Sequence, residues 1–176
     1  MPHLRDRMLD ALAGLLVRIH LAGFYWGDCS LANTLFRRDA GALTAYVVDT
    51  ETGELHPALS DGQRAADLQI AYENIAGGLM DLQAAGELPE AVDPVASAFT
   101  VGERYEALWT AVTEVESFRP DETYRITARI QRLNELGFDV EEVELTQTPD
   151  TQQVLLKPRV VELGYHGPRL RELTGL

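Results

Sequence analysis

The chain has 176 residues, of which 45% are hydrophobic and 24% are charged, and this composition suits one domain, or one domain with a small appendage. Its 28 acidic and 15 basic residues give a net charge of -13, which would repel both nucleic acid and an anionic membrane surface. No apolar run approaches the ~20 residues that a membrane span needs, and a single cysteine excludes an intrachain disulfide. The sequence therefore predicts a soluble, cytoplasmic protein with no nucleic-acid partner and no membrane span.

The first part of the chain is predicted to form a helix, a loop and a hairpin. Apolar residues at helical spacing indicate a helix from Leu4 to Ala22, and Gly23 is a suitable end for it. The segment Phe24–Asn33 is expected to be a loop. Thr34 begins a short strand, and Leu43–Val48 is rich in β-forming residues, which predicts the second strand of the hairpin.

The middle of the chain is predicted to be mainly helical. After an irregular stretch at 50–62, apolar periodicity indicates a long helix over Gln63–Ala85. Gly77-Gly78 in its middle costs roughly 1 kcal/mol of helix stability per Gly relative to Ala, which indicates a kink or the close approach of another backbone. A linker at 87–97 then precedes an amphipathic helix at 102–115.

The last part of the chain is predicted to hold a helix over 121–136 and a β-hairpin formed by Val140–Thr146 and Gln152–Lys157. The segment 160–163 would add a strand, and 168–173 a last helical turn or two. The helix carries a basic face, which is either an anion site or, the favoured interpretation, a solvated or ion-paired surface. Its members are Arg125, Arg129 and Arg132.

Residues of the loop and of the hairpin end follow a phosphoryl-transfer pattern. Asn33 lies five residues after Asp28, and Asp49 closes an apolar strand. In the protein-kinase signature, a loop Asp accepts the proton of the acceptor hydroxyl, while an Asn and a second Asp hold Mg²⁺ against the phosphates of ATP. We therefore predict that Asp28 and Asn33 are catalytic and that Asn33 and Asp49 bind metal and nucleotide. Glu51 is either a further metal ligand or a loop acid. The alternative is an ordinary turn Asp and cap Asn.

Neighbouring residues also have structural interpretations. Cys29 has no basic neighbour that would lower its thiol pKa, so a nucleophilic pair with His20 is disfavoured. His20 and Trp26 are instead expected to pack the end of the helix against the loop. Asp67, near the start of the long helix, either accepts hydrogen bonds from the loop backbone or lies in solvent.

Residues 4–60 resemble the catalytic-lobe core of the lipopolysaccharide kinase (Kdo/WaaP-like) group of the protein-kinase-like superfamily. Residues 64–176 resemble the actinobacterial domain of unknown function 4032. The motifs of this second resemblance are Arg64-Ala65-Ala66-Asp67-Leu68, Gly77-Gly78-Leu79-Met80-Asp81-Leu82, Arg132-Leu133-Asn134-Glu135-Leu136-Gly137-Phe138-Asp139 and Leu170-Arg171-Glu172-Leu173-Thr174-Gly175-Leu176. Only the first resemblance implies a mechanism.

By position, the kinase resemblance implies that Asp28 is the catalytic base, Asn33 the loop metal ligand and Asp49 the counterpart of the Asp in D-F-G. Ser30 stands where protein kinases usually have a Lys. Asp49-Thr50-Glu51 replaces D-F-G, as in small-molecule kinases of the choline and aminoglycoside type, and no A-P-E-like segment follows. The resemblance therefore implies a small-molecule or sugar acceptor rather than a protein.

The lobe that holds ATP in a kinase has no counterpart in this sequence. Only 27 residues precede Asp28, whereas a kinase places its Gly-rich loop and phosphate-pairing Lys before the catalytic loop. The single Lys is Lys157. The chain is therefore expected to be either a fragment of a longer kinase-like protein or a chain that has lost this lobe. Binding of Mg²⁺ and ATP by the chain alone is expected to be weak or absent.

Taken together, the sequence predicts an α+β, mostly helical fold in two parts. Residues 1–118 would form the C-terminal lobe of a protein-kinase-like fold, with the catalytic loop at 25–33 and the metal-binding Asp49. Residues 119–176 would form a small helix-hairpin module. The predicted function is the catalytic-lobe portion of a phosphotransferase, and the alternative is a non-catalytic interaction or scaffold module. Apolar surface left by the missing lobe predicts a homo-oligomer, most simply a dimer.

Overall fold

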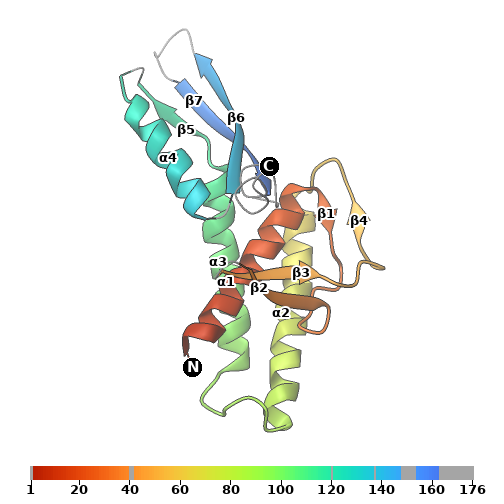
Figure 1. Ribbon diagram of the computed structural model, residues 1–176. Helices are drawn as coiled ribbons and strands as arrows, with labels where there is room; N and C mark the ends of the chain where they lie inside the picture. The colour runs from red at the N-terminus through yellow and green to blue at the C-terminus, as the bar shows by residue number, and fades with distance from the viewer. Residues whose placement is uncertain (1, 40–41, 120, 137, 148–153, 163–176) are drawn as a thin grey trace, which may run out of the picture. The chain divides into compact units, whose positions relative to one another are not determined.

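The computed structural model describes residues 2–39, 42–119, 121–136, 138–147 and 154–162. The chain divides into two compact units, Met1–Leu108 and Trp109–Leu176 (Figure 1). The fold is α+β, and its helices hold more residues than its strands, as the sequence predicts. None of the helices in the described ranges is long and apolar enough to cross a membrane. The two units meet within a helix, whereas the sequence analysis places the boundary after residue 118.

Helix α1 (Pro2–Leu21) supplies much of the core of the first unit. Its inward side chains recur at helical spacing, and Leu16 and Val17 are fully buried. Leu12, Leu15 and Leu16, from which the helix is predicted, are all buried, and the prediction is confirmed. The chain turns at Gly23, whose φ of 79° favours a residue without a side chain.

Two antiparallel strand pairs follow α1 in the first unit (Figure 1). The strand β1 (Phe24–Tyr25) pairs with β4 (Glu54–Leu55), and β2 (Thr34–Asp39) pairs with β3 (Ala42–Val47). The predicted hairpin is therefore confirmed, and its second strand packs against α1. The β1–β4 pair lies in segments for which no strand is predicted, since two residues per strand give no readable alternation.

The two ends of the segment 24–55 are fixed by a close backbone contact. His56 N donates to Gly23 O at 2.8 Å. A Cβ on Gly23 would lie 2.0 Å from His56 O, so only glycine permits this approach. The loop that contains the predicted site residues therefore starts and ends at one place.

Helix α2 (Asp61–Ala84) begins with a capping box, in which Gln63 N donates to Ser60 Oγ at 3.2 Å and Ser60 N donates to Gln63 Oε1 at 3.0 Å. Its buried residues are Asp67, Ala71, Ile75 and Ala76. A Cβ on Gly78 would lie 3.5 Å from Leu31 Cδ1. That distance is an ordinary contact, and a Cβ on Gly77 would meet no atom within 4 Å, so the predicted close approach of another backbone is wrong at both glycines.

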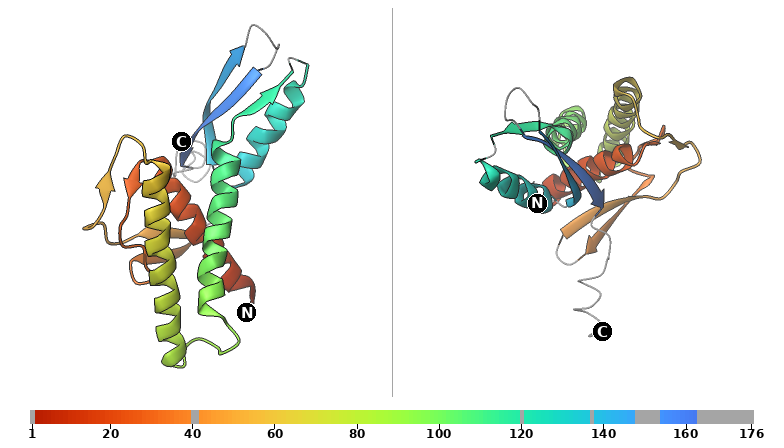
Figure 2. Two further views of the ribbon diagram at one scale, coloured as in Figure 1. Left: turned by 180° about the vertical axis from the view of Figure 1, so that it is seen from behind. Right: turned by 90° about the horizontal axis from the view of Figure 1, so that it is seen from above.

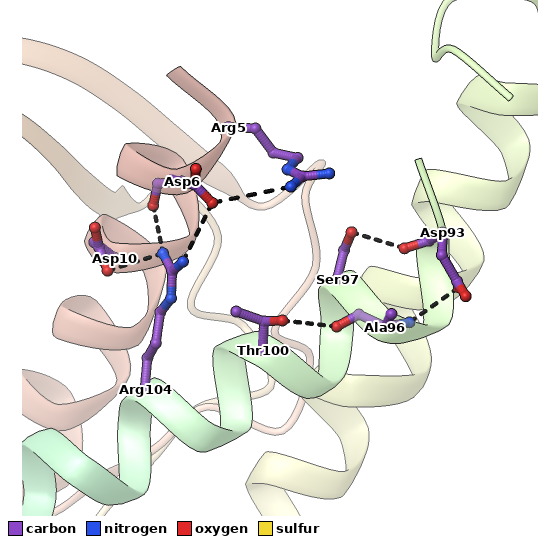
Figure 3. A network of polar contacts seen from close by, with 8 residues as sticks. All are labelled: Arg5, Asp6, Asp10, Asp93, Ala96, Ser97, Thr100 and Arg104. Carbon is purple, nitrogen blue, oxygen red and sulfur yellow. Dashed lines mark hydrogen bonds and ion pairs between the residues drawn. The ribbon is translucent and has the colours of Figure 1, made fainter. Parts of the chain in front are cut away.

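Helix α3 (Pro94–Thr113) begins earlier than the sequence predicts. The prediction of a linker over 87–97 is therefore wrong for its last four residues, 94–97, which are helical. Proline is favoured at the first position of a helix, because its missing N–H would have no partner there. Asp93 caps the helix, since its Oδ1 accepts a hydrogen bond of 3.0 Å from Ala96 N (Figure 3). Proline thus marks the start of this helix and not a break.

Arg104 joins α3 to α1 within the first unit (Figure 3). Its Nη1 donates to Asp6 O at 2.6 Å and to Asp10 Oδ1 at 2.9 Å, and its Nη2 donates to Asp6 Oδ1 at 3.3 Å. The two acids lie one helical turn apart, so one planar guanidinium contacts both. This partly exposed contact links the two helices.

The second unit contains the end of α3, a three-stranded antiparallel sheet and one helix. In spatial order the strands are β5 (Glu116–Phe118), β7 (Val154–Glu162) and β6 (Phe138–Gln147), and α4 (Thr123–Glu135) packs against β6. The predicted hairpin is confirmed, and the segment 160–162 continues its second strand. The predictions for residues 163 and 168–173 lie outside the described residues.

Arg129 of α4 is buried in the second unit. Its Nη1 lies 2.6 Å from Glu116 Oε1, and its Nη2 donates to the carbonyl oxygens of Ala111, at 3.3 Å, and of Glu114. Arg125 forms an ion pair one turn earlier on the same helix. The ion-paired interpretation of the basic face is therefore confirmed for these two arginines.

Candidate functional site

One buried carboxylate of α2 holds the start of the candidate catalytic loop. Asp67 is fully buried, its Oδ2 accepts from Trp26 N and its Oδ1 from Gly27 N, each at 2.8 Å. His20 Nε2 donates to Asp67 Oδ2 at 3.0 Å. Burial opposes ionisation, but these hydrogen bonds outweigh it and lower the pKa of Asp67 below its ordinary value. Of the two interpretations of Asp67, contact with the loop backbone is therefore confirmed.

A chain of hydrogen bonds extends from Asp67 to α3. Arg64 Nη1 donates to Tyr105 Oη at 3.1 Å, and Tyr105 Oη lies 2.7 Å from His20 Nδ1. Because His20 donates from Nε2 to the carboxylate, its Nδ1 accepts the Tyr105 proton when the ring is neutral. Burial raises the pKa of Tyr105 to about 12, against the lowering effect of Arg64, so the hydroxyl keeps its proton. The loop is thus connected to all three helices of the first unit.

Both oxygens of the Asp28 carboxylate accept an amide hydrogen bond. Asn33 Nδ2 donates to Oδ2 at 2.8 Å, and Asn74 Nδ2, from α2, donates to Oδ1 at 3.1 Å. The structure therefore brings together Asp28 and Asn33, the two predicted catalytic residues. An ionised carboxylate has about four lone-pair positions, so Asp28 can accept a further proton donor, such as a substrate hydroxyl.

The hairpin brings Asn33 and Asp49 to the same end. Val48 N donates to Asn33 O at 3.1 Å, which extends the β2–β3 pairing and places Asp49 directly after it. Trp26 Nε1 donates to Asp49 O at 3.0 Å, and Glu51 N donates to Asp49 Oδ1 at 3.1 Å. The side chains of Asp49 and Glu51 are exposed. The loop, the hairpin end and the segment 49–51 are therefore joined by hydrogen bonds.

Oxygen atoms of Asn33 and Asp49 are available to a metal ion. Asn33 Oδ1 and Asp49 Oδ2 accept no hydrogen bond from the residues that the structure describes. Such oxygens suit Mg²⁺, which keeps several waters and needs only one or two protein ligands besides phosphate. Within the same described ranges, no group of three or more His, Cys, Asp and Glu side chains is placed to hold a metal. A role for Glu51 as a further ligand stays a prediction.

Two other loop residues have structural roles. Cys29 is fully buried, and burial, together with the charges of Asp67 and Asp28, raises the pKa of its thiol far above its ordinary value. A thiolate nucleophile therefore does not form near neutral pH. Ser30 Oγ accepts from Asn33 N at 3.2 Å, so Ser30 shapes the turn that presents Asn33.

An exposed apolar patch lies on the hairpin beside these residues. Leu35 and Tyr46 are cross-strand partners, and Val48 lies two residues after Tyr46, on the same face. Their exposed fractions are 47%, 37% and 57%. The patch of Leu35, Tyr46 and Val48 therefore adjoins the hairpin end that holds Asn33 and Asp49.

The last part of the chain matches a family model. Residues 107–176 match the family described as Domain of unknown function (DUF4032). This match confirms the second predicted resemblance for those residues. No curated protein and no solved structure matches the chain significantly.

The DUF4032 match begins within α3 and does not include the loop 25–33 or Asp49. The resemblance of residues 4–60 to the lipopolysaccharide kinase group therefore rests on the residues themselves and stays a prediction. Since DUF4032 is described as a domain of unknown function, it assigns no chemistry to the second unit.

Two residues of this arrangement, both before the DUF4032 region, are not found by the sequence analysis. Asn74 follows Asp67 by two helical turns, so both face the loop from one side of α2. This spacing of polar residues on a buried face is a signal from which Asn74 can be found. Tyr105 gives no such signal, because its partner His20 is 85 residues away and it resembles an ordinary core aromatic residue.

Proposed function

We propose that the first unit is the catalytic-lobe portion of a phosphotransferase that transfers the γ-phosphoryl group of ATP to a hydroxyl of a small molecule or sugar. The main support is the placement of Asn33. Its side chain donates to the Asp28 carboxylate, and its carbonyl accepts from Val48 N, next to Asp49. One residue thus connects the proposed base to the proposed metal ligand.

In this reaction a bond forms between the acceptor oxygen and the γ-phosphorus, while the bond from that phosphorus to the leaving oxygen of ADP breaks. Asp28 accepts the hydroxyl proton, and the amides of Asn33 and Asn74 hold its carboxylate in position. Asn33 Oδ1 and Asp49 would hold Mg²⁺, which neutralises charge on the phosphates. The contribution of the chain is mainly positioning and electrostatics.

The chain supplies only part of the nucleotide site in this proposal. The first unit contains no Lys, since the single Lys of the chain, Lys157, lies in β7 of the second unit. A Lys that pairs with the phosphates would therefore come from a segment outside the first unit or from another chain. The patch of Leu35, Tyr46 and Val48 offers an apolar surface to that segment or to the nucleotide base. We therefore expect the chain alone to bind nucleotide weakly and to turn over negligibly.

Titration of the chain with ATP is expected to give weak, Mg²⁺-dependent binding that is lost in Asp49→Ala. The substitution removes the exposed carboxylate that would hold the metal, and no buried contact is lost with it. Isothermal titration calorimetry with ATP and excess Mg²⁺, and with EDTA as the metal-free reference, measures this. Asp81→Ala is the matched control, because Asp81 is also an exposed acid of the first unit. Equal affinities of the two variants would contradict the assignment of Asp49.

A second candidate function, a non-catalytic interaction or scaffold module, is favoured by the exposed patch of Leu35, Tyr46 and Val48. If two copies associate through this patch, the protein is a homodimer and Leu35→Ser converts it to a monomer. Sedimentation velocity at micromolar concentrations measures the change. Leu55→Ser is the control, because Leu55 is 77% exposed outside the patch. A wild-type protein that is monomeric throughout this range would exclude the dimer.

A further inference from the structure

A groove lies between α2 and α3 of the first unit, on the pair of helices that Figure 2 shows side by side. Its volume is about 480 Å³. Its lining includes the buried residues Leu16, Ala71 and Ile75. The groove shares no residue with the loop 25–33 or with Asp49, so what it binds does not depend on the proposed phosphoryl transfer.

Aromatic side chains line the groove on both helices. Tyr72 of α2 and Phe99 of α3 have ring centroids 4.5 Å apart, and Phe99 is 57% exposed. Gly102, one turn after Phe99, would meet no atom within 4 Å if it carried a Cβ, so a partner backbone can approach closely there. An exposed Phe99 packed against the half-buried Tyr72, beside an open glycine, is typical of a binding surface rather than of a solvated helix face.

The edge of the groove is acidic. Glu103 and Glu106 line it from α3, and both are exposed. No Lys, Arg or His belongs to the lining, all of which falls within the described residues. Positive charge on a partner would therefore interact favourably with this edge. A second copy of the chain, with a net charge of -13, would bring mainly like charge, which disfavours it as the occupant.

We propose that this groove binds an amphipathic helix of another protein, whose apolar stripe is flanked by Lys or Arg. A groove formed by two helices accepts a third helix through apolar residues at positions i, i+3, i+4 and i+7. The stripe would contact Tyr72, Phe99 and the buried floor, and the basic residues would pair with Glu103 and Glu106. The apolar contacts supply most of the affinity, and the charges select the partner.

A labelled helical peptide of about 15 residues, long enough to form several turns, tests this proposal. It carries Leu at i, i+3, i+4 and i+7 with Lys at the flanking positions, and fluorescence anisotropy at low salt measures its affinity. Phe99→Ala is expected to weaken binding by roughly tenfold or more. The double variant E103Q/E106Q is expected to weaken binding and to reduce its salt dependence.

Two controls distinguish binding in the groove from nonspecific hydrophobic binding. Leu55→Ala removes an exposed apolar side chain elsewhere on the first unit and is expected to leave binding unchanged. A peptide with Glu in place of every Lys is expected not to bind. Equal binding of the two peptides, equal affinities of Phe99→Ala and Leu55→Ala, or no peptide binding at all would overturn the proposal. A dimer that Phe99→Ala converts to a monomer would show instead that a second copy occupies the groove.

Discussion

Replacing Asp67 with Ala is expected to lower the free energy of unfolding of the first unit by about 3–5 kcal/mol, the usual cost of removing one partner from a buried charged network. Asp67 is fully buried and accepts hydrogen bonds from His20, Trp26 and Gly27. Without the carboxylate, these donors stay buried with no acceptor. Urea unfolding at neutral pH, followed by Trp26 fluorescence in a Trp109→Phe background, measures the change.

Two further variants show that the effect comes from the buried carboxylate. Asp81→Ala removes an exposed acid of the same helix and is expected to change stability little. Because the folded pKa of Asp67 is lowered, its contribution is complete above the unfolded value of about 3.9 and is lost as pH falls through the folded value. In Asp67→Asn this part of the acid dependence should be missing. An Asp67→Ala protein as stable as Asp81→Ala would refute the anchoring role.

Trp26→Ala is expected to destabilise the first unit by about 3–5 kcal/mol, because removal of a buried Trp leaves a large cavity. Trp26 is fully buried beneath the candidate site, and its Nε1 donates to Asp49 O at 3.0 Å. Chemical unfolding followed by circular dichroism measures the loss, since the substitution removes the fluorophore.

Trp26→Phe separates the packing role of Trp26 from its hydrogen bond. It retains most of the ring volume but leaves the Asp49 carbonyl without its donor, at a cost of about 1 kcal/mol. We expect this variant to fold, and to bind Mg²⁺ and ATP more weakly than the wild type does, because Asp49 is less well positioned. If Trp26→Phe kept full nucleotide affinity, the hydrogen bond would not position the metal ligand.

Much of the first unit was predictable because its long elements have strong periodicity. The α1 stripe, the hairpin and the long helix α2 follow from apolar spacing alone. The predicted start of α3 was wrong because Pro94 can either interrupt a helix or begin one. The hydrogen bond by which Asp93 caps the helix shows that Pro94 begins it. The β1–β4 pair was missed because two-residue strands have no pattern to detect.

The candidate site was predictable only where its residues are close in sequence. Asp28 and Asn33 lie on one loop, and their spacing predicts that they serve one site; the structure places them in hydrogen-bond contact. The contacts of Asn74 and Tyr105 join segments more than 40 residues apart. The spacing of Asn74 from Asp67 marks it as a residue of the buried face, but no local pattern identifies the distant partner of either residue. For Asp67 the sequence left two interpretations open, because a helical Asp faces the core or the solvent depending on tertiary packing.

The contacts of Arg129 determine where the second unit could be cut from the rest of the chain without loss of a buried ion pair. Its guanidinium bonds to carbonyl oxygens at the end of α3 and to Glu116, so residues on both sides of a helix end satisfy one buried charge. A gene fusion or recombination that joined residues 119–176 to another protein would carry Arg129 along without these partners. A junction near residue 107, where the family match begins, would keep them. A second unit that keeps this ion pair therefore includes the last turns of α3, a helix that also belongs to the first unit.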